Sequence, residues 1–143
     1  MFYVLAIGTL SFAADDHVLL YIDGVSRGWT YDAYPSTHTE PVTSACSITF
    51  QLFNYVTGAG GFMASTSSGL MTDSSWKCSS VTEPGWTLCE FDDAHWSNAV
   101  VVGSNHNPPW YSFNGIHSSA KWISLSVDAG TAYCRKRLCR TTF

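Results

Sequence analysis

Short stretches in which apolar and polar residues alternate recur along the chain, and they predict β-strands. The clearest stretch is 46–53, where Cys46, Ile48, Phe50 and Leu52 fall on one side and Ser, Thr and Gln residues on the other. This period of two is typical of a half-buried strand, and a slip of one residue would expose its whole apolar set. Further strands are predicted at 9–14, 17–22, 100–102, 121–127 and 133–138. Of these, 17–22 is apolar on both sides and should be central, and 100–102 should be a short buried strand.

Turn signals separate these stretches. Asp23-Gly24 predicts a tight hairpin, because glycine accepts the positive φ that such turns need. We expect 35–41 to be a loop, the glycines at 58–61 to mark a bulge or a close backbone approach, and 92–96 to form one helical turn capped by Asp92. No segment sustains a period of 3.6. The pattern therefore predicts an all-β fold, a single antiparallel β-sandwich formed by residues 1–143.

Composition supports this fold and narrows the partners. A chain of 143 residues is long enough for one domain with a normal core. Charged residues make up only 13%, against about 25% in an average soluble domain, and the net charge of −4 gives no general basic field for nucleic acid. The one basic run predicts a solvated strand edge, or less simply a contact with an anionic partner; it consists of Arg135, Lys136, Arg137 and Arg140. No apolar stretch reaches the length of a membrane span.

The five cysteines indicate an oxidising compartment, so we expect a secreted, extracellular protein. No Cys-x-x-Cys pair suggests zinc. Two disulfides plus one leftover thiol, or an intermolecular bridge, are the alternatives, and the pairing of Cys46, Cys89 and Cys139 stays open. The apolar start resembles a short secretory segment but lacks a basic beginning, so 8–14 is interpreted as a strand. The sequence leaves open whether Met1 is the true start.

Residues 72–96 organise the rest of the chain. They contain three of the six tryptophans and two of the five cysteines, with few charges. Such a segment predicts a long connection, tethered by disulfides, that lies over a core. Trp76, Trp96 and Trp122 fall inside patterned elements and are predicted to be core residues.

The sequence shows no convincing catalytic constellation, and we expect no enzyme. Asp92 and Asp93 are adjacent, so their side chains diverge in extended structure and favour a structural role. The histidines show no zinc-helix spacing, and no Gly-x-Ser-x-Gly elbow occurs. No cofactor is predicted, although Asp15, Asp16 and Asp23 could gather at one hairpin as calcium ligands if turn chemistry does not fully explain them.

Aromatic residues in loops carry the strongest functional signal. Their flat apolar faces and polar edges suit stacking on sugar rings, and loops on a rigid scaffold often carry binding sites. The alternatives are that these side chains lock the loops or pack against another protein chain. The candidate ligand-binding residues are Trp29, Tyr31, Tyr34, His106, Trp110 and Tyr111.

The order of several motifs gives a family resemblance that covers about residues 8–138. The motifs DDHVLLYIDG, GAGGFMAS, WKCS, FDDAHW, KWIS and YCRK together resemble galactose-binding-like jelly-roll domains, including the sugar-binding modules of family 2 glycoside hydrolases and α-L-rhamnosidases. The form with WKCS and YCR is similar to modules in secreted marine-invertebrate proteins. The resemblance implies an eight-stranded sandwich, a hairpin marked by the DD and YIDG motifs, a structural FDDAHW motif and a Cys78–Cys134 disulfide.

Two functions are consistent with these observations. The first is a secreted, non-enzymatic recognition module that binds a neutral glycan through loop aromatics. The second is a structural component of an extracellular assembly, such as a matrix or biomineral scaffold, that contacts other proteins. A fold alone does not decide between them, because function resides in sites built on the fold.

Overall fold

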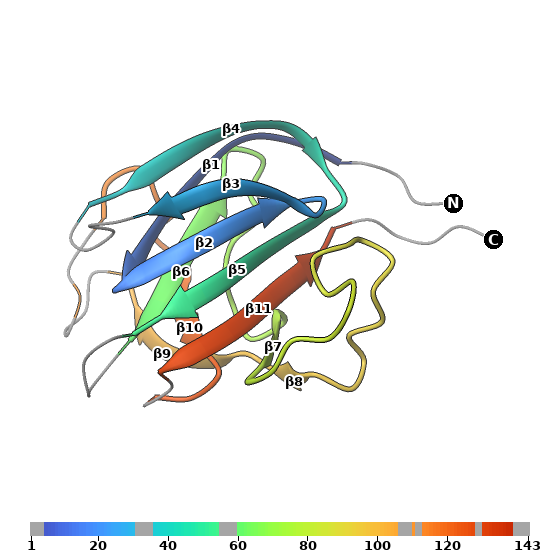
Figure 1. Cartoon of the computed structure of the whole chain (residues 1–143). Helices are drawn as coiled ribbons and strands as arrows, with labels where there is room; N and C mark the ends of the chain where they lie inside the picture. The colour runs from blue at the N-terminus through green and yellow to red at the C-terminus, as the bar shows by residue number, and fades with distance from the viewer. Residues whose placement is uncertain are drawn as a thin grey trace.

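A computed structural model describes residues 5–30, 36–54, 60–105, 110, 113–127 and 130–138, with only the backbone for Leu5, Trp29 and Thr30. The described chain forms strands, turns and connections without a helix, and no part of it could cross a membrane as an apolar helix. Its strands form two antiparallel sheets that pack face to face (Figure 1). The predicted all-β sandwich is therefore confirmed.

The order of strands differs from their order in the sequence. The five-stranded sheet runs β4 (His38–Ala45), β1 (Leu5–Asp15), β6 (Gly61–Thr66), β10 (Lys121–Ser124) and β9 (Val100–Ser104). The six-stranded sheet runs β3 (Val25–Thr30), β2 (His17–Ile22), β5 (Ser47–Phe53), β11 (Thr131–Arg137), β7 (Lys77–Ser79) and β8 (Ser97–Asn98). Jelly-roll connectivity stays a prediction from the family resemblance.

The main core lies between the sheets. The alternation of 46–53 places Ile48, Phe50 and Leu52 inward, and all three are fully buried. The rings of Phe50 and Phe62 lie 4.6 Å apart between centroids, and Trp76 packs 5.9 Å from Phe62. Aromatic pairs at these separations add to the free energy of burial, so the predicted strand register and the core role of Trp76 are both confirmed.

A second apolar cluster covers part of the outer face of the five-stranded sheet. Ala14 belongs to the main core, so the preceding residue, Ala13, points outward. It packs beneath residues 110–122, where Trp110 and Trp122 stack with their ring centroids 4.3 Å apart. Segment 113–120 thus covers this part of the outer face of the five-stranded sheet. It buries Trp122, whose predicted role as a buried residue is confirmed.

The β2–β3 hairpin turns as predicted. Asp23 has a φ of 49° and Gly24 a φ of 82°. Two successive positive φ values define the turn type whose twist matches that of paired strands.

Two local predictions, the loop at 35–41 and the burial of the valines at 100 and 101, are wrong. Residues 38–45 form edge strand β4, although 35–41 was expected to be a loop, because an edge strand tolerates Pro41. The valines at 100 and 101 are exposed, because β9 is an edge strand.

The glycines at 60 and 61 lead into β6, and a Cβ added at Gly61 would lie 3.0 Å from the backbone oxygen of Ile123, so the close backbone approach expected there is present. Gly58 lies outside the described residues. Residues 92–96 form a single hydrogen-bonded turn, in which the N–H of Trp96 donates to the carbonyl of Asp93 and Asp92 Oδ1 accepts the N–H of Ala94, in keeping with the one capped turn expected there.

The interpretation of the basic run as a solvated edge is also wrong. Strand β11 lies between β5 and β7, so it has no open edge. Arg135 is fully buried, and Lys136 and Arg137 are half-buried. Arg140 lies outside the described residues.

Candidate functional site

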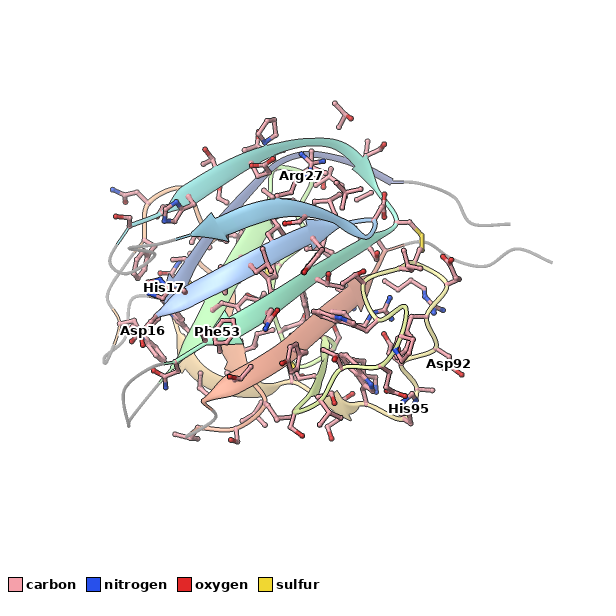
Figure 2. The ribbon with its side chains drawn as sticks, viewed as in Figure 1. Asp16, His17, Arg27, Phe53, Asp92 and His95 are labelled. Carbon is pink, nitrogen blue, oxygen red and sulfur yellow. A yellow bond between two sulfur atoms is a disulfide. The ribbon has the colours of Figure 1, made fainter. Side chains whose placement is uncertain are left out.

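Residues 80–96, here called the covering segment, connect β7 to β8 and lie over the outer face of the six-stranded sheet. Figure 2 labels Asp92 and His95 on this segment, at the opposite end of the sheet from His17 and Phe53. The segment begins next to a disulfide between Cys78 in β7 and Cys134 in β11. A second disulfide links Cys89, within the segment, to Cys46 at the start of β5. The prediction of a long, disulfide-tethered connection is confirmed.

The two disulfides also settle most of the cysteine pairing. The Cys78–Cys134 bond that the family resemblance implied is present, between directly opposed residues of neighbouring strands. The Cys46–Cys89 bond resolves a pairing that the sequence left open. Cys139 lies outside the described residues.

A buried arginine fixes the covering segment to the sheet. The guanidinium of Arg135 donates to Asp93 Oδ2 at 2.6 Å, to the carbonyl of Leu88 at 2.6 Å and to that of Phe91 at 3.1 Å. Its central carbon also lies 5.1 Å from the centroid of the Phe91 ring. Burial lowers the pKa of Arg135, and the charge of Asp93 opposes this effect. Because arginine stays charged at neutral pH, these groups form a buried clamp between strand and segment.

Three half-buried rings meet where the covering segment crosses the sheet. Tyr21 in β2 and Tyr133 in β11 point outward, because their neighbours in each strand face the core. Trp86 of the segment packs edge-to-face with Tyr21 at 5.8 Å and with Tyr133 at 5.3 Å between ring centroids. We call Tyr21, Trp86 and Tyr133 the aromatic patch. Its rings are held by strands on two sides and by a tethered segment on the third.

A hollow of about 470 Å³ adjoins this patch. Trp96 stands between the two, since it stacks on Trp86 at 6.2 Å and also lines the hollow. The Oε2 atom of Glu83 accepts hydrogen bonds from Trp96 Nε1 and from His95 Nε2, each at 2.7 Å. These bonds, that from Trp96 first, lower the pKa of Glu83. The hollow therefore presents a fixed, ionised carboxylate whose Oε1 atom makes no hydrogen bond to the described residues.

The sequence-predicted ligand residues fall in different places. The backbone of Trp29 pairs with Leu19 in β2, and its side chain lies outside the described part of the structure. Tyr31, Tyr34, His106 and Tyr111 lie outside the described residues.

The prediction that Trp110 offers an open ring face is wrong. This side chain is only 1% exposed, it stacks on Trp122, and its indole N–H donates to Asp15 Oδ2 at 2.9 Å. An indole whose face is packed and whose N–H is bonded has a structural role.

The three aspartates proposed for calcium do not gather. Asp16 precedes β2 and Asp23 follows it, so six strand residues separate them by about 20 Å. Asp23 Oδ1 accepts the backbone N–H groups of Cys46 and Ser47, both at 2.8 Å, which ties the hairpin to the start of β5. Within the described ranges, no group of three or more His, Cys, Asp or Glu side chains could hold a metal ion.

The aspartates of the FDDAHW motif are structural, as expected. Asp93 pairs with Arg135, and Asp92 Oδ1 accepts the backbone N–H of Ala94 at 3.0 Å.

Sequence reasoning missed Tyr21, Tyr133 and Glu83. The outward direction of both tyrosines follows from the burial of their strand neighbours in the core, which the apolar run at 17–22 did not reveal. Glu83 gave no local signal, since its two partners, His95 and Trp96, follow it by 12 and 13 residues.

Comparisons of the chain with protein-family models, with curated proteins and with solved structures found no match. The galactose-binding-like resemblance therefore rests on the sequence motifs, and the function is argued from the geometry of the described residues.

Proposed function

We propose that this protein is an extracellular, non-enzymatic recognition module that binds a neutral glycan at the aromatic patch and the adjoining Glu83 hollow. One observation carries the proposal: three half-buried rings are fixed on one sheet face beside an ionised carboxylate. The two disulfides support an extracellular location, because such bonds persist in oxidising compartments.

The two parts of the site suit different parts of a sugar. The C–H faces of a sugar ring are apolar and can pack on Trp86 and its neighbouring tyrosines. Sugar hydroxyls are hydrogen-bond donors, and Glu83 Oε1 is an ionised acceptor beside them. The clamp of Arg135 and the Cys46–Cys89 bond hold the segment in place before the ligand arrives, which lowers the entropy lost on binding.

The hollow supports binding rather than hydrolysis. Glu83 is the one carboxylate among its described lining residues, whereas glycoside hydrolysis generally requires two carboxyl groups on opposite sides of the bond. The carboxylate of Glu83 is therefore better suited to accepting a hydrogen bond from a ligand than to catalysing hydrolysis.

A glycan array followed by calorimetric titration tests the proposal. Trp86→Ala should weaken binding of the best array ligand by about 2 kcal/mol, or about thirtyfold, because central tryptophans often dominate binding energy. Trp86→Phe should retain part of the affinity. Val25→Ala, at the exposed β2–β3 turn, is the control and should bind like the wild type. An array without any bound sugar, or equal affinity for wild type and a folded Trp86→Ala variant, would contradict the proposal.

A specific surface favours the second function, a structural component of an extracellular assembly. Val100 and Val101 are 39% and 44% exposed on edge strand β9, and Val127 is 55% exposed. Apolar edge strands are common sites of pairing with other chains. Sedimentation velocity should show self-association that Val101→Lys abolishes. A protein that stays monomeric at high concentration and copurifies with no partner would remove this alternative.

A further inference from the structure

The outer face of the five-stranded sheet changes character along its strands. Under segment 113–120 the outward residues Ala13 of β1 and Met63 of β6 are apolar and buried. Two residues further along each strand, the outward positions are Ser11 and Ser65, which are register partners. The apolar cover thus ends where the sheet face becomes lined with hydroxyl groups.

At this border lies a hollow of about 370 Å³, within the range of small-molecule sites. The hollow is lined by hydroxyl-bearing residues of β1 and of residues 65–67, and by Ile116 and His117 of segment 113–120. Ser11 is only 7% exposed and Ser65 only 5%. Ser11 lines the hollow and its hydroxyl makes no hydrogen bond to the described residues, so it is available to a ligand.

The other polar groups around the hollow are held in fixed orientations. Ser65 Oγ accepts the backbone N–H of His117 at 2.8 Å, which leaves its proton to donate. Ser67 Oγ accepts the N–H of Thr9 at 3.0 Å and donates to the carbonyl of Ile7 at 3.2 Å. His117 Nδ1 accepts the N–H of Ser119 at 3.0 Å, so the neutral ring carries its proton on Nε2.

We propose that this hollow is a second ligand site, which takes a small uncharged polyhydroxylated molecule such as a single sugar ring or a polyol. Hydroxyl groups both donate and accept, so Ser11 and Ser65 can match ligand hydroxyls in either direction. The described lining includes no Asp, Glu, Lys or Arg. A charged ligand would lose hydration in the hollow without meeting an opposite charge, so binding of an uncharged ligand is favoured over binding of a charged one.

The site is independent of the aromatic patch. It belongs to the five-stranded sheet, whereas Tyr21, Trp86 and Tyr133 lie on the outer face of the other sheet. The inference therefore does not rest on glycan binding at the patch, and the two can fail separately.

Titration followed by two-dimensional amide NMR tests the proposal, with glucose, galactose, mannose and myo-inositol as separate probes and glucuronate as a charged comparison. At least one neutral probe should give saturable shifts at the amides of Ser65, Ser67 and His117, with a dissociation constant in the millimolar range. Glucuronate should bind more weakly than the neutral probe.

Variants separate this site from other causes of the shifts. Ser11→Ala and Ser65→Ala should each weaken binding about threefold to tenfold, the value of one hydrogen bond. Ser44→Ala is the matched control, because Ser44 is an exposed serine of the same sheet that lies outside the hollow. Trp86→Ala should leave these shifts unchanged. The proposal is overturned if no neutral probe gives saturable shifts, or if shifts of full affinity persist in both serine variants.

Discussion

Replacing the buried Arg135 by alanine should destabilise the protein more than removing an exposed charged side chain from one of its strands does. Arg135 is fully buried and pairs with Asp93, whose side chain is 20% exposed. Its loss leaves that carboxylate without its cation and removes the donors for two carbonyls, those of Leu88 and Phe91. Breaking a buried pair in this way costs about 3–5 kcal/mol. Since domains of this kind are stable by only about 5–15 kcal/mol, the loss is a large fraction of the total.

The matched control is an exposed pair in the same protein. Arg27 donates to Glu40 at 2.8 Å, and the two side chains are 34% and 27% exposed. Solvent screens this pair, so Arg27→Ala should cost at most about 1 kcal/mol. Arg135→Lys should fall between the two alanine variants, because lysine keeps the charge but cannot donate in three directions from a planar group.

Urea unfolding followed by tryptophan fluorescence, under non-reducing conditions, measures these differences. In a parallel thermal unfolding experiment, the melting temperature of Arg135→Ala should fall by roughly 10–20 °C. Asp93→Ala should not add fully to Arg135→Ala, because the two side chains share one interaction. A loss for Arg135→Ala no larger than that for Arg27→Ala would refute the reasoning. In that case the disulfides alone would hold the covering segment.

Three further predictions concern the tethers and the titrating groups. Removing Cys46–Cys89 by a double alanine substitution should cost up to about 4 kcal/mol of unfolding free energy, measured in urea, and should weaken glycan binding because the loop that it closes carries Trp86. Burial raises the pKa of Asp15, so its cost to stability is present above the folded-state pKa and disappears as the pH falls below the unfolded value. In parallel urea titrations, Asp15→Asn should therefore gain stability relative to the wild type as the pH rises above about 4, the unfolded pKa of an aspartate. The pKa of Glu83 is lowered, so its contribution is present above the unfolded pKa and is lost as the pH falls through the folded value; Glu83→Gln should flatten the acid limb of the stability profile, and an unchanged limb would contradict the assignment.

The strands of the core were predictable because their signal is local. In 46–53 the apolar residues recur at every second position, and one buried face is enough to fix both the element and its register. The same reasoning gave β2 with its observed bounds and the turn at Asp23 and Gly24. These features depend on residues that are near neighbours in the sequence.

Features that depend on distant partners were not predictable. A basic run normally indicates a solvated surface. Arg135 is buried nevertheless, because the covering segment brings Asp93, which lies 42 residues earlier in the sequence, into hydrogen-bond contact with it. Trp110 looked like an open loop residue because nothing in its neighbourhood reveals that Trp122 will stack on it. Long-range pairing of this kind is fixed by how the connections cross the sheets, which the alternation of a single strand does not encode.

The location of both candidate sites also depends on how the connections cross the sheets. Each sheet has an inner face, which alternation predicts, and an outer face. The burial of the side chains on the outer face depends on which segment crosses it. Where a segment crosses, outward residues such as Ala13 or Arg135 are buried; where the cover ends, outward residues remain partly open, with tyrosines on one sheet and serines on the other. Alternation in 9–14 assigns Ser11 to the outer face, whereas the outward direction of Tyr21 and Tyr133 is clear only once their neighbours are seen to be buried in the core. The positions of the two crossing segments also had to come from the structure, and these positions create the two hollows that we propose as binding sites.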